Sequence, residues 1–260
     1  MLLAIDIGNT RTTFALMRGT SVIAEEHASS PRLNFRKARE IIRTISVAVP
    51  GETISSTGIA SVVPTLTDLV RNAADEIVRK PSQLVTSQSA RFETSYTAPD
   101  TIGADRICNA VAAFHHAKGA AIVIDCGTAI TLDCIGPSGE FLGGAILPGY
   151  RTAAQSLNTT TAQLPEVILN APALAMGQST DQCLRSGIVL GTTYAIEGLI
   201  GRMMFESFDN IFPELIVTGG HADVFLKTSS LRANKLPDLV LTGIALIFKE
   251  ERILIETSEK

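Results

Sequence analysis

An aspartate followed by a glycine-containing turn occurs twice in this sequence. The first copy is Asp6-Ile7-Gly8-Asn9-Thr10, and the second is Asp125-Cys126-Gly127-Thr128-Ala129. Glycine allows a close approach of the backbone to a ligand, and successive N–H groups in such a turn can bind an anion. A carboxylate beside a phosphate can hold a cation. Each copy alone could be a hairpin whose Asp caps its own turn. One copy in each half of the chain favours a duplicated phosphate clamp.

A third candidate for chemistry is Gly103-Ala104-Asp105-Arg106. Apolar residues follow at helical spacing (Ile107, Val111 and Phe114), so Asp105 and Arg106 are predicted in the first turn of a helix. An Asp at this place is also a common helix cap. An Arg there gains nothing from the helix dipole, so a role in binding a carboxylate or phosphate explains it better.

The elements that position these residues follow from short apolar runs bounded by turn residues, which predict buried strands. Each Asp-x-Gly turn is expected to join the first two strands of a three-stranded meander, and helical patterns follow. The first half is predicted as β-β-β-α-β-α-β. The chain is expected to end with a strand over residues 239–241 and a helix over 243–253. This alternation is typical of an α/β protein.

Length and composition narrow the function. The chain has 260 residues, enough for two medium domains, and 22 basic against 26 acidic side chains give a net charge of −4. No basic run occurs, so neither nucleic acid nor an anionic membrane is an expected partner. Apolar runs are short, and Asp6 interrupts the N-terminal one, so a cytoplasmic location is expected. The four cysteines form no CxxC pair and are expected to be small buried residues of a reducing compartment. The four histidines are expected at surface or cap positions.

Several nucleotide and hydrolase fingerprints are absent from the sequence. There is no Gly-Lys pair, which excludes a P-loop, and no Gly-x-Gly, which excludes the dinucleotide and protein-kinase glycine loops. HExxH and GxSxG are also missing. A nucleotide-binding protein with this sequence must use another architecture.

Taken together, the motifs closely resemble those of the type III pantothenate kinases, within the acetate kinase/sugar kinase/heat-shock chaperone/actin superfamily. Asp-x-Gly alone indicates only the superfamily, whereas Gly-Ala-Asp-Arg before Asp-x-Gly-Thr-Ala is specific. The resemblance extends over essentially the whole chain and departs at no motif position. Its further matching segments are Ser61-Val62-Val63-Pro64, Tyr96 with Pro99, Gly143 to Gly149, Leu164-Pro165, Gly177 to Thr180, Ser186-Gly187 and Thr218-Gly219-Gly220.

The resemblance implies an α/β fold of two duplicated ribonuclease-H-like domains, with mixed sheets flanked by helices, facing each other across a nucleotide cleft. We place these domains at residues 1–117 and 118–260. The implied reaction is phosphorylation of the primary hydroxyl of pantothenate by ATP, the first step of coenzyme A synthesis. A homodimer is also implied, with the pantothenate pocket close to the subunit interface.

The resemblance also assigns roles to individual residues. Asp105 corresponds to the general base. Asp6 lies near Mg²⁺, and Asp125 matches the position that binds a monovalent cation, potassium or ammonium. The ATP contacts are Asp6, Ile7, Gly8, Asn9, Thr10, Arg11, Thr12, Thr13 and Thr128. The substrate contacts are Tyr96, Gly103, Ala104, Asp105, Arg106 and Thr180.

Two other functions use the same motifs in part. An exopolyphosphatase-like phosphohydrolase on the same duplicated fold would share Asp6 and Asp125 but needs no alcohol pocket. A non-catalytic, nucleotide-binding accessory factor for transcription is the other alternative. The intact Asp6, Asp105 and Asp125 and the absence of a basic segment argue against that last reading.

Overall fold

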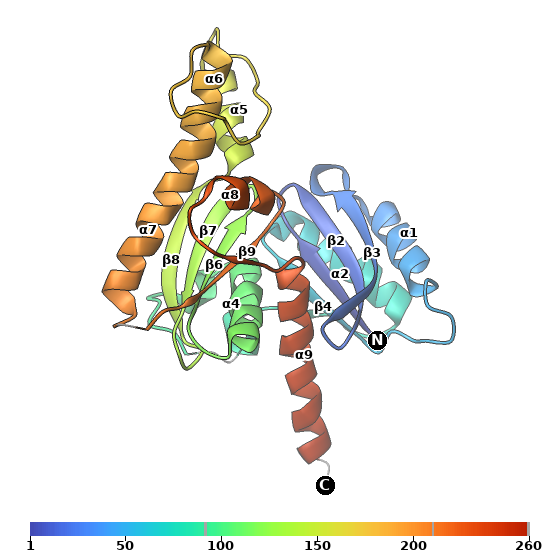
Figure 1. The fold of residues 1–260 in the computed structure, drawn as a ribbon. Coiled ribbons are helices and arrows are strands. Elements are labelled where there is room, and N and C mark those ends of the chain that lie inside the picture. Colours follow the sequence, from blue (N-terminus) through green and yellow to red (C-terminus); the bar gives the residue numbers. More distant parts are fainter. Residues whose placement is uncertain (91–92, 210, 259–260) are drawn as a thin grey trace. The chain divides into compact units, whose positions relative to one another are not determined.

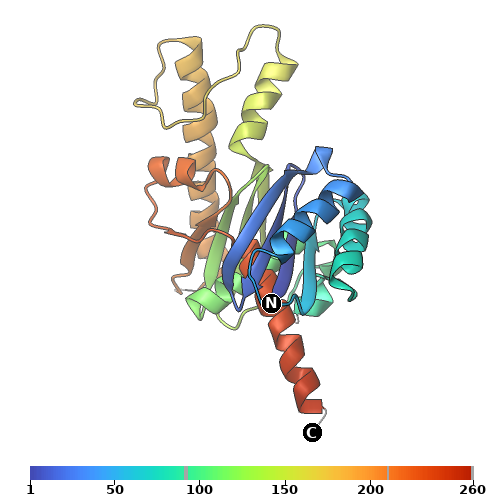
Figure 2. The same cartoon turned by 90° about the vertical axis from the view of Figure 1, so that its right-hand side faces the viewer.

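The structure is a computed structural model, and it describes residues 1–90, 93–209 and 211–258. The chain divides into two compact units that interleave along the sequence. Unit 1 contains Met1–Glu93, Thr97–Ala112 and Asp238–Lys260, and unit 2 contains Thr94–Tyr96 and Ala113–Pro237. The division differs from a single boundary at 117/118 because the C-terminal helix packs with the first unit. The ribbon is drawn in Figures 1 and 2.

Unit 1 is built on a mixed five-stranded sheet with the order β3-β2-β1-β4-β5. The first three strands form an antiparallel meander, and β4 and β5 extend the sheet in parallel. The β-β-β-α-β-α-β prediction for this half is confirmed. The strands are β1 (Leu2–Ile7), β2 (Arg11–Arg18), β3 (Ser21–Ser29), β4 (Ser56–Ser61) and β5 (Gln83–Leu84).

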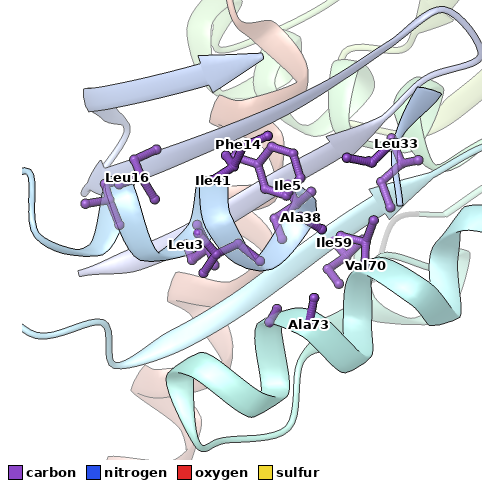
Figure 3. Close-up of a cluster of buried hydrophobic side chains, with 14 residues drawn as sticks. Leu3, Ile5, Phe14, Leu16, Leu33, Ala38, Ile41, Ile59, Val70 and Ala73 are labelled. Atoms are coloured by element: carbon purple, nitrogen blue, oxygen red, sulfur yellow. The ribbon is translucent and has the colours of Figure 1, made fainter. Parts of the chain in front are cut away.

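Helices α1 (Phe35–Ser46) and α2 (Pro64–Val78) cover one face of this sheet. Figure 3 shows alternate strand residues, such as Leu3 and Ile5, pointing at Ala38, Ile41 and Val70 of the helices. Burying each of the larger side chains contributes about 1.5–3 kcal/mol. Because side chains alternate along a strand, Asp6 belongs to the other face.

The opposite face is covered by α9 (Leu239–Ser258), which packs against β1 and β4. Gly58 of β4 permits this, since an added Cβ would lie 2.4 Å from the Phe248 ring. Gly243 brings α9 equally close to α4 (Ala104–Ala117), where a Cβ would lie 2.2 Å from the Cys108 carbonyl oxygen.

The expected strand over residues 239–241 is wrong, because those residues form the first turn of α9. The N–H of Thr242 donates to the Asp238 oxygen at 2.9 Å, which is helical bonding. The short apolar run is part of a buried helix face, and periodicity alone does not separate the two in so few residues. Between β5 and α4 lie two short helical turns, α3 (Ser87–Ala90) and η2 (Pro99–Thr101).

Unit 2 repeats the same strand order, β10-β9-β6-β7-β8. In unit 1 Asp6 pairs with Thr13 across the hairpin, and in unit 2 Asp125 pairs with Thr131. The predicted duplication and α/β fold class are thus confirmed. The strands are β6 (Ala121–Cys126), β7 (Ala129–Ile135), β8 (Phe141–Pro148), β9 (Glu214–Thr218) and β10 (Asn234–Lys235).

A long helical segment runs along the sheet of unit 2 and beyond it (Figure 1). Ile196 and Ile200 of this segment pack into the core with Ile122, Ile124 and Tyr150. The helical segment Thr180–Ser207 is long and apolar enough to cross a membrane by length and composition alone. The core helices of soluble proteins can meet the same two criteria. The helical elements are α5 (Tyr150–Thr160), α6 (Thr180–Arg185), η3 (Ser186–Leu190, a π-helix), α7 (Gly191–Ser207) and α8 (Ala222–Thr228).

Cysteine positions agree with the sequence in three cases. Cys108, Cys126 and Cys134 are buried, but Cys183 on α6 is exposed, so the expectation that all four are buried is wrong. Its thiol donates to the Gly177 oxygen at 3.4 Å.

Candidate functional site

The first Asp-x-Gly turn lies at the end of β1. The N–H of Gly8 donates to the Arg11 oxygen at 3.1 Å and closes the turn, which leaves Asn9 and Thr10 exposed. Thr12 and Thr13 are buried at the start of β2, and Asp6 is half-buried near the end of β1. The turn therefore offers exposed backbone and short polar side chains beside one carboxylate.

The residues around Asp105 meet this turn within unit 1. Asp105 lies in the first turn of α4, where its Oδ1 accepts a hydrogen bond from the Arg106 N–H at 2.8 Å. An added Cβ at Gly103 would lie 2.5 Å from Asp105 Oδ1 and 3.6 Å from a Val62 methyl. Val62 in turn donates its N–H to the Ile7 oxygen at 3.1 Å. Gly103, Val62 and the Asp6 strand end thus share one corner of the unit.

Burial controls the electrostatics of this corner. Desolvation raises the pKa of Asp105 above its ordinary value of 3.8, and the Arg106 N–H and guanidinium only partly offset that rise. Burial also raises the pKa of Cys108 well above its usual range, and the charges of Asp6 and Asp105 raise it further. The thiol therefore stays protonated and inert at neutral pH.

The second turn lies at the end of β6 in unit 2. Its closing bond runs from the Gly127 N–H to the Ala129 oxygen at 3.1 Å. Asp125 is half-buried, and Thr128 is exposed. Gly219, with φ at +88°, lies against Asp125, since a Cβ there would lie 2.5 Å from the carboxylate Oδ1. Backbone and carboxylate oxygen are therefore packed closely on this side of the turn.

Tyr96 is held by a loop that pairs with the sheet of unit 2. Thr94 Oγ1 donates to the Phe141 oxygen at 2.8 Å and accepts the Tyr96 N–H at 3.0 Å. The Tyr96 ring makes an edge contact with Phe141, with centroids 5.9 Å apart. These contacts fix the backbone and ring of one predicted substrate residue.

Thr180 lies apart from the turn of unit 2, at the exposed first residue of α6. Ser179 caps that helix by accepting the Gln182 N–H at 3.3 Å. Figure 1 places α6 at the far end of the helical extension of unit 2. The structure therefore unites Asp6–Thr13 with Gly103–Arg106 in unit 1 and Asp125 with Thr128 in unit 2, and it does not bring Thr180 to the Asp125 turn.

His221 is a residue whose place the sequence predicted only in part. It occupies the cap position of α8, one of the two places expected for the histidines (surface or cap), but its ring is half-buried and packs against Tyr150 with centroids 6.3 Å apart. Desolvation and the Arg151 charge lower its pKa below 6.5, so the ring is neutral at pH 7. Its backbone N–H donates to the Cys126 oxygen at 3.0 Å, beside the second turn. In the sequence, only its place just after the Gly219-Gly220 pair could have indicated that His221 lies beside the second turn.

Within residues 1–90, 93–209 and 211–258, the side chains of His, Cys, Asp and Glu form no group of three suited to a metal ion. One groove of about 440 Å³ lies beside Arg32 and Lys37, and another of about 640 Å³ lies beside Met204 and Leu231. None of the predicted site residues lines either groove.

Comparisons with known proteins are extensive. A family model described as type III pantothenate kinase matches residues 2–202. The type III pantothenate kinase of Rhodospirillum rubrum is 35% identical over 260 residues, covering 97% of this chain and 99% of that protein. The same-named protein of Desulfatibacillum aliphaticivorans is 33% identical over 253 residues, covering 95% and 98%.

Solved structures share the fold at lower sequence identity. A Campylobacter jejuni protein with a provisional description as a Baf family transcriptional activator aligns with a TM-score of 0.61 at 22% identity, covering 96% of this chain and 98% of that one. Component A of the (R)-2-hydroxyglutaryl-CoA dehydratase of Acidaminococcus fermentans aligns with a TM-score of 0.56 at 13% identity, with the same coverage. At these identities the likeness concerns the fold alone.

Proposed function

Because this chain belongs to the type III pantothenate kinase family, we propose that Asp105 is the general base when the protein phosphorylates pantothenate with ATP. The family match gives the reaction itself, which is ATP-dependent phosphorylation of pantothenate in coenzyme A biosynthesis. The family model and the curated relatives favour this reaction over an exopolyphosphatase-like phosphohydrolase and over a non-catalytic, nucleotide-binding accessory factor for transcription.

The observation that supports Asp105 is its half-buried place in the first turn of α4, with a pKa raised by desolvation. A base with a raised pKa accepts a proton from an alcohol more readily than an ordinary carboxylate does. In phosphoryl transfer the attacking alcohol gains little charge until its bond to phosphorus is largely formed. A carboxylate within hydrogen-bond reach therefore takes the proton of the alcohol as that bond forms. Gly103, which precedes this turn, packs against Val62, and Val62 donates its N–H to Ile7, the residue after Asp6.

The two duplicated turns would bind the ATP phosphates. In the first turn, the exposed Asn9, Thr10 and Arg11 supply backbone and side-chain donors, and Thr128 supplies the corresponding contact in the second. The half-buried Asp6 and Gly8 and the buried Ile7, Thr12 and Thr13 complete the proposed ATP contacts. Donors fixed by the fold stabilise the charge of a transferred phosphoryl group without reorganising during the reaction. The substrate side would be formed by Gly103, Ala104, Arg106 and Tyr96, with Arg106 binding the carboxylate of pantothenate. Thr180 completes the proposed substrate contacts.

The donor sets fit the two proposed cations. Mg²⁺ is commonly held by one or two carboxylates together with substrate phosphates, and Asp6 supplies one carboxylate beside the phosphate turn. Asp125 supplies a carboxylate at the end of β6, close to the exposed Thr128 in the sequence, and oxygen ligands of this kind suit a weakly bound potassium or ammonium ion. When bound, these cations would neutralise phosphate charge.

A homodimer would form through the outer face of α7. Tyr194 and Phe205 on this helix are 55% and 80% exposed. Gly191, Gly198 and Gly201 are exposed as well, and a Cβ at any of them would meet nothing within 4 Å. Since neither packing within the chain nor backbone conformation requires these glycines, close approach of a second copy explains them. The cytoplasm, where ATP and pantothenate meet, is the proposed location.

One coupled assay tests the function as a whole. Purified protein is given ATP and pantothenate, with and without potassium, and ADP release is followed. Release that depends on pantothenate and rises with potassium is expected. Release of phosphate from polyphosphate without pantothenate would contradict the kinase assignment.

A further inference from the structure

Ser30 lies outside the first phosphate turn and donates two hydrogen bonds to its backbone. It is the first residue after β3 and is only 2% exposed. Its N–H donates to the Thr10 oxygen at 3.1 Å, and its Oγ donates to the Gly8 oxygen at 2.6 Å. Two carbonyl groups of the turn therefore point toward a single residue outside it.

Thr12 completes this arrangement. Its Oγ1 lies 2.9 Å from Ser30 Oγ. A hydroxyl carries one proton, and the Ser30 proton is directed at Gly8, so Thr12 is the donor in this pair. Loss of the Ser30 hydroxyl would leave both the Gly8 oxygen and the Thr12 hydroxyl without this buried partner.

The second turn is also held by residues that follow the third strand of its meander, but here two residues donate to one carbonyl oxygen. Strand β8 has the position in its sheet that β3 has in the other, and Gly149 follows it. The Gly149 N–H donates to the Thr128 oxygen at 3.0 Å, and Thr152 Oγ1 donates to the same oxygen at 2.5 Å. Gly149 is required here, because a Cβ would lie 2.3 Å from the Gly127 oxygen.

A carbonyl held in this way also orients an N–H. The peptide group is planar and trans, so the oxygen of one residue and the N–H of the next point in opposite directions. A fixed Gly8 oxygen thus directs the Asn9 N–H away from Ser30. A fixed Thr128 oxygen likewise directs the Ala129 N–H away from Thr152.

We propose that Ser30 and Thr152 are positioning residues that aim the amides of the two turns at the ATP phosphates. The inference rests on the proposed function, in which those turns bind the phosphates. Neither hydroxyl contacts ATP in this scheme, and each acts through a turn carbonyl. Preorganised donors of this kind lose binding strength when the groups that support them are removed.

The test compares Ser30→Ala and Thr152→Val with wild type, with ATP and pantothenate varied separately. Each substitution is expected to raise the KM for ATP about 3- to 10-fold, the range for one lost hydrogen bond, and to change the KM for pantothenate less than about twofold. Because the two hydroxyls donate to different carbonyl oxygens, in separate turns, the double variant should multiply the effects. Thr152→Ser, which keeps the hydroxyl, should retain wild-type kinetics.

Matched controls remove hydroxyls that also donate to carbonyl oxygens but lie outside the turns. Thr44→Val acts on α1, where Oγ1 donates to Glu40, and Thr159→Val acts on α5, where Oγ1 donates to Gln155. Both should leave the KM for ATP unchanged. If Ser30→Ala fails to fold, the half-buried Thr152 decides the question.

The outcomes separate this inference from the proposed function. If Asp6→Asn impairs use of ATP while Thr152→Val lowers only the melting temperature, the positioning role is wrong and the turn assignment stands. If Asp6→Asn leaves the KM for ATP and kcat unchanged, the turns do not bind phosphate and both proposals fail.

Discussion

Gly103 and Asp105 are packed so closely that an added Cβ on the glycine would lie 2.5 Å from Oδ1 of the aspartate. The nearest group is the end of a flexible side chain rather than backbone. A larger residue would therefore displace the carboxylate without preventing folding. Gly103 thus controls where the proposed base can lie.

Gly103→Ala is expected to lower kcat by about 10²-fold, because a displacement of about 1 Å in a catalytic group has effects on that scale. The melting temperature should change little. Gly119→Ala is the control, since the nearest atom to its Cβ is a carbonyl oxygen 4.0 Å away. Unchanged kcat in Gly103→Ala would show that the Asp105 carboxylate need not occupy its place in the structure.

Asp105→Asn removes the proposed base and keeps the shape. Turnover should fall roughly 10²–10⁴-fold, the usual contribution of general base catalysis. In wild type the acidic limb of the kcat profile should lie above pH 3.8, since burial raises the pKa of this carboxyl. The exposed Asp68 on α2 provides the control Asp68→Asn. Near-normal turnover in Asp105→Asn would rule out the assignment.

Asp105→Asn, which should lower turnover, should at the same time raise the stability of the folded protein. A carboxyl whose pKa is raised on folding binds its proton more tightly in the folded state. Its stabilising effect is full below the ordinary value of 3.8 and is lost as pH rises through the raised pKa. At neutral pH the ionised Asp105 thus lowers the free energy of unfolding, and Asp105→Asn should be more stable than wild type. Urea unfolding at neutral pH and at about pH 4 checks this, and the gain should shrink at the lower pH.

Sequence patterns were sufficient for the duplicated meanders, because each apolar run sits beside a turn of distinctive chemistry. The same reasoning failed at Leu239–Leu241, where three apolar residues fit either a strand or a buried helix. The helix is favoured by packing against residues distant in the sequence, such as that of Gly243 against the Cys108 backbone. Nothing in the local sequence around the C-terminal helix indicates that this helix packs against unit 1.

For the candidate site, motif residues could be recognised but their supports could not. Ser30 and Thr152 lie outside every motif, and each is a common hydroxyl residue near a helix start. Their importance arises only when the sheet brings β3 and β8 beside the turns. His221 was expected at a surface or cap position, whereas its packing against Tyr150 depends on segments about seventy residues apart in the sequence.

Gly219 should govern the response to a monovalent cation. Its φ is +88°, and a Cβ added there would lie 2.5 Å from Asp125 Oδ1, so any side chain strains the backbone and displaces the carboxylate. Gly219→Ala is expected to require roughly 10- to 100-fold more potassium for half-maximal activation, as in other changes to groups that orient a metal ligand. Gly119→Ala again serves as control. Potassium activation identical to wild type would remove Asp125 from the cation site.

The outer face of α7 should determine the oligomeric state. Gly198→Glu places a charge on a surface where Tyr194 and Phe205 are exposed, and burial of an unpaired charge against a second copy is costly. Light scattering should report a dimer for wild type and a monomer for Gly198→Glu at the same concentration. Asn72→Glu, on the exposed face of α2, should remain dimeric. If the pantothenate pocket lies close to the interface, the monomeric variant should also show a raised KM for pantothenate. A Gly198→Glu protein that remains dimeric would place the subunit contact elsewhere.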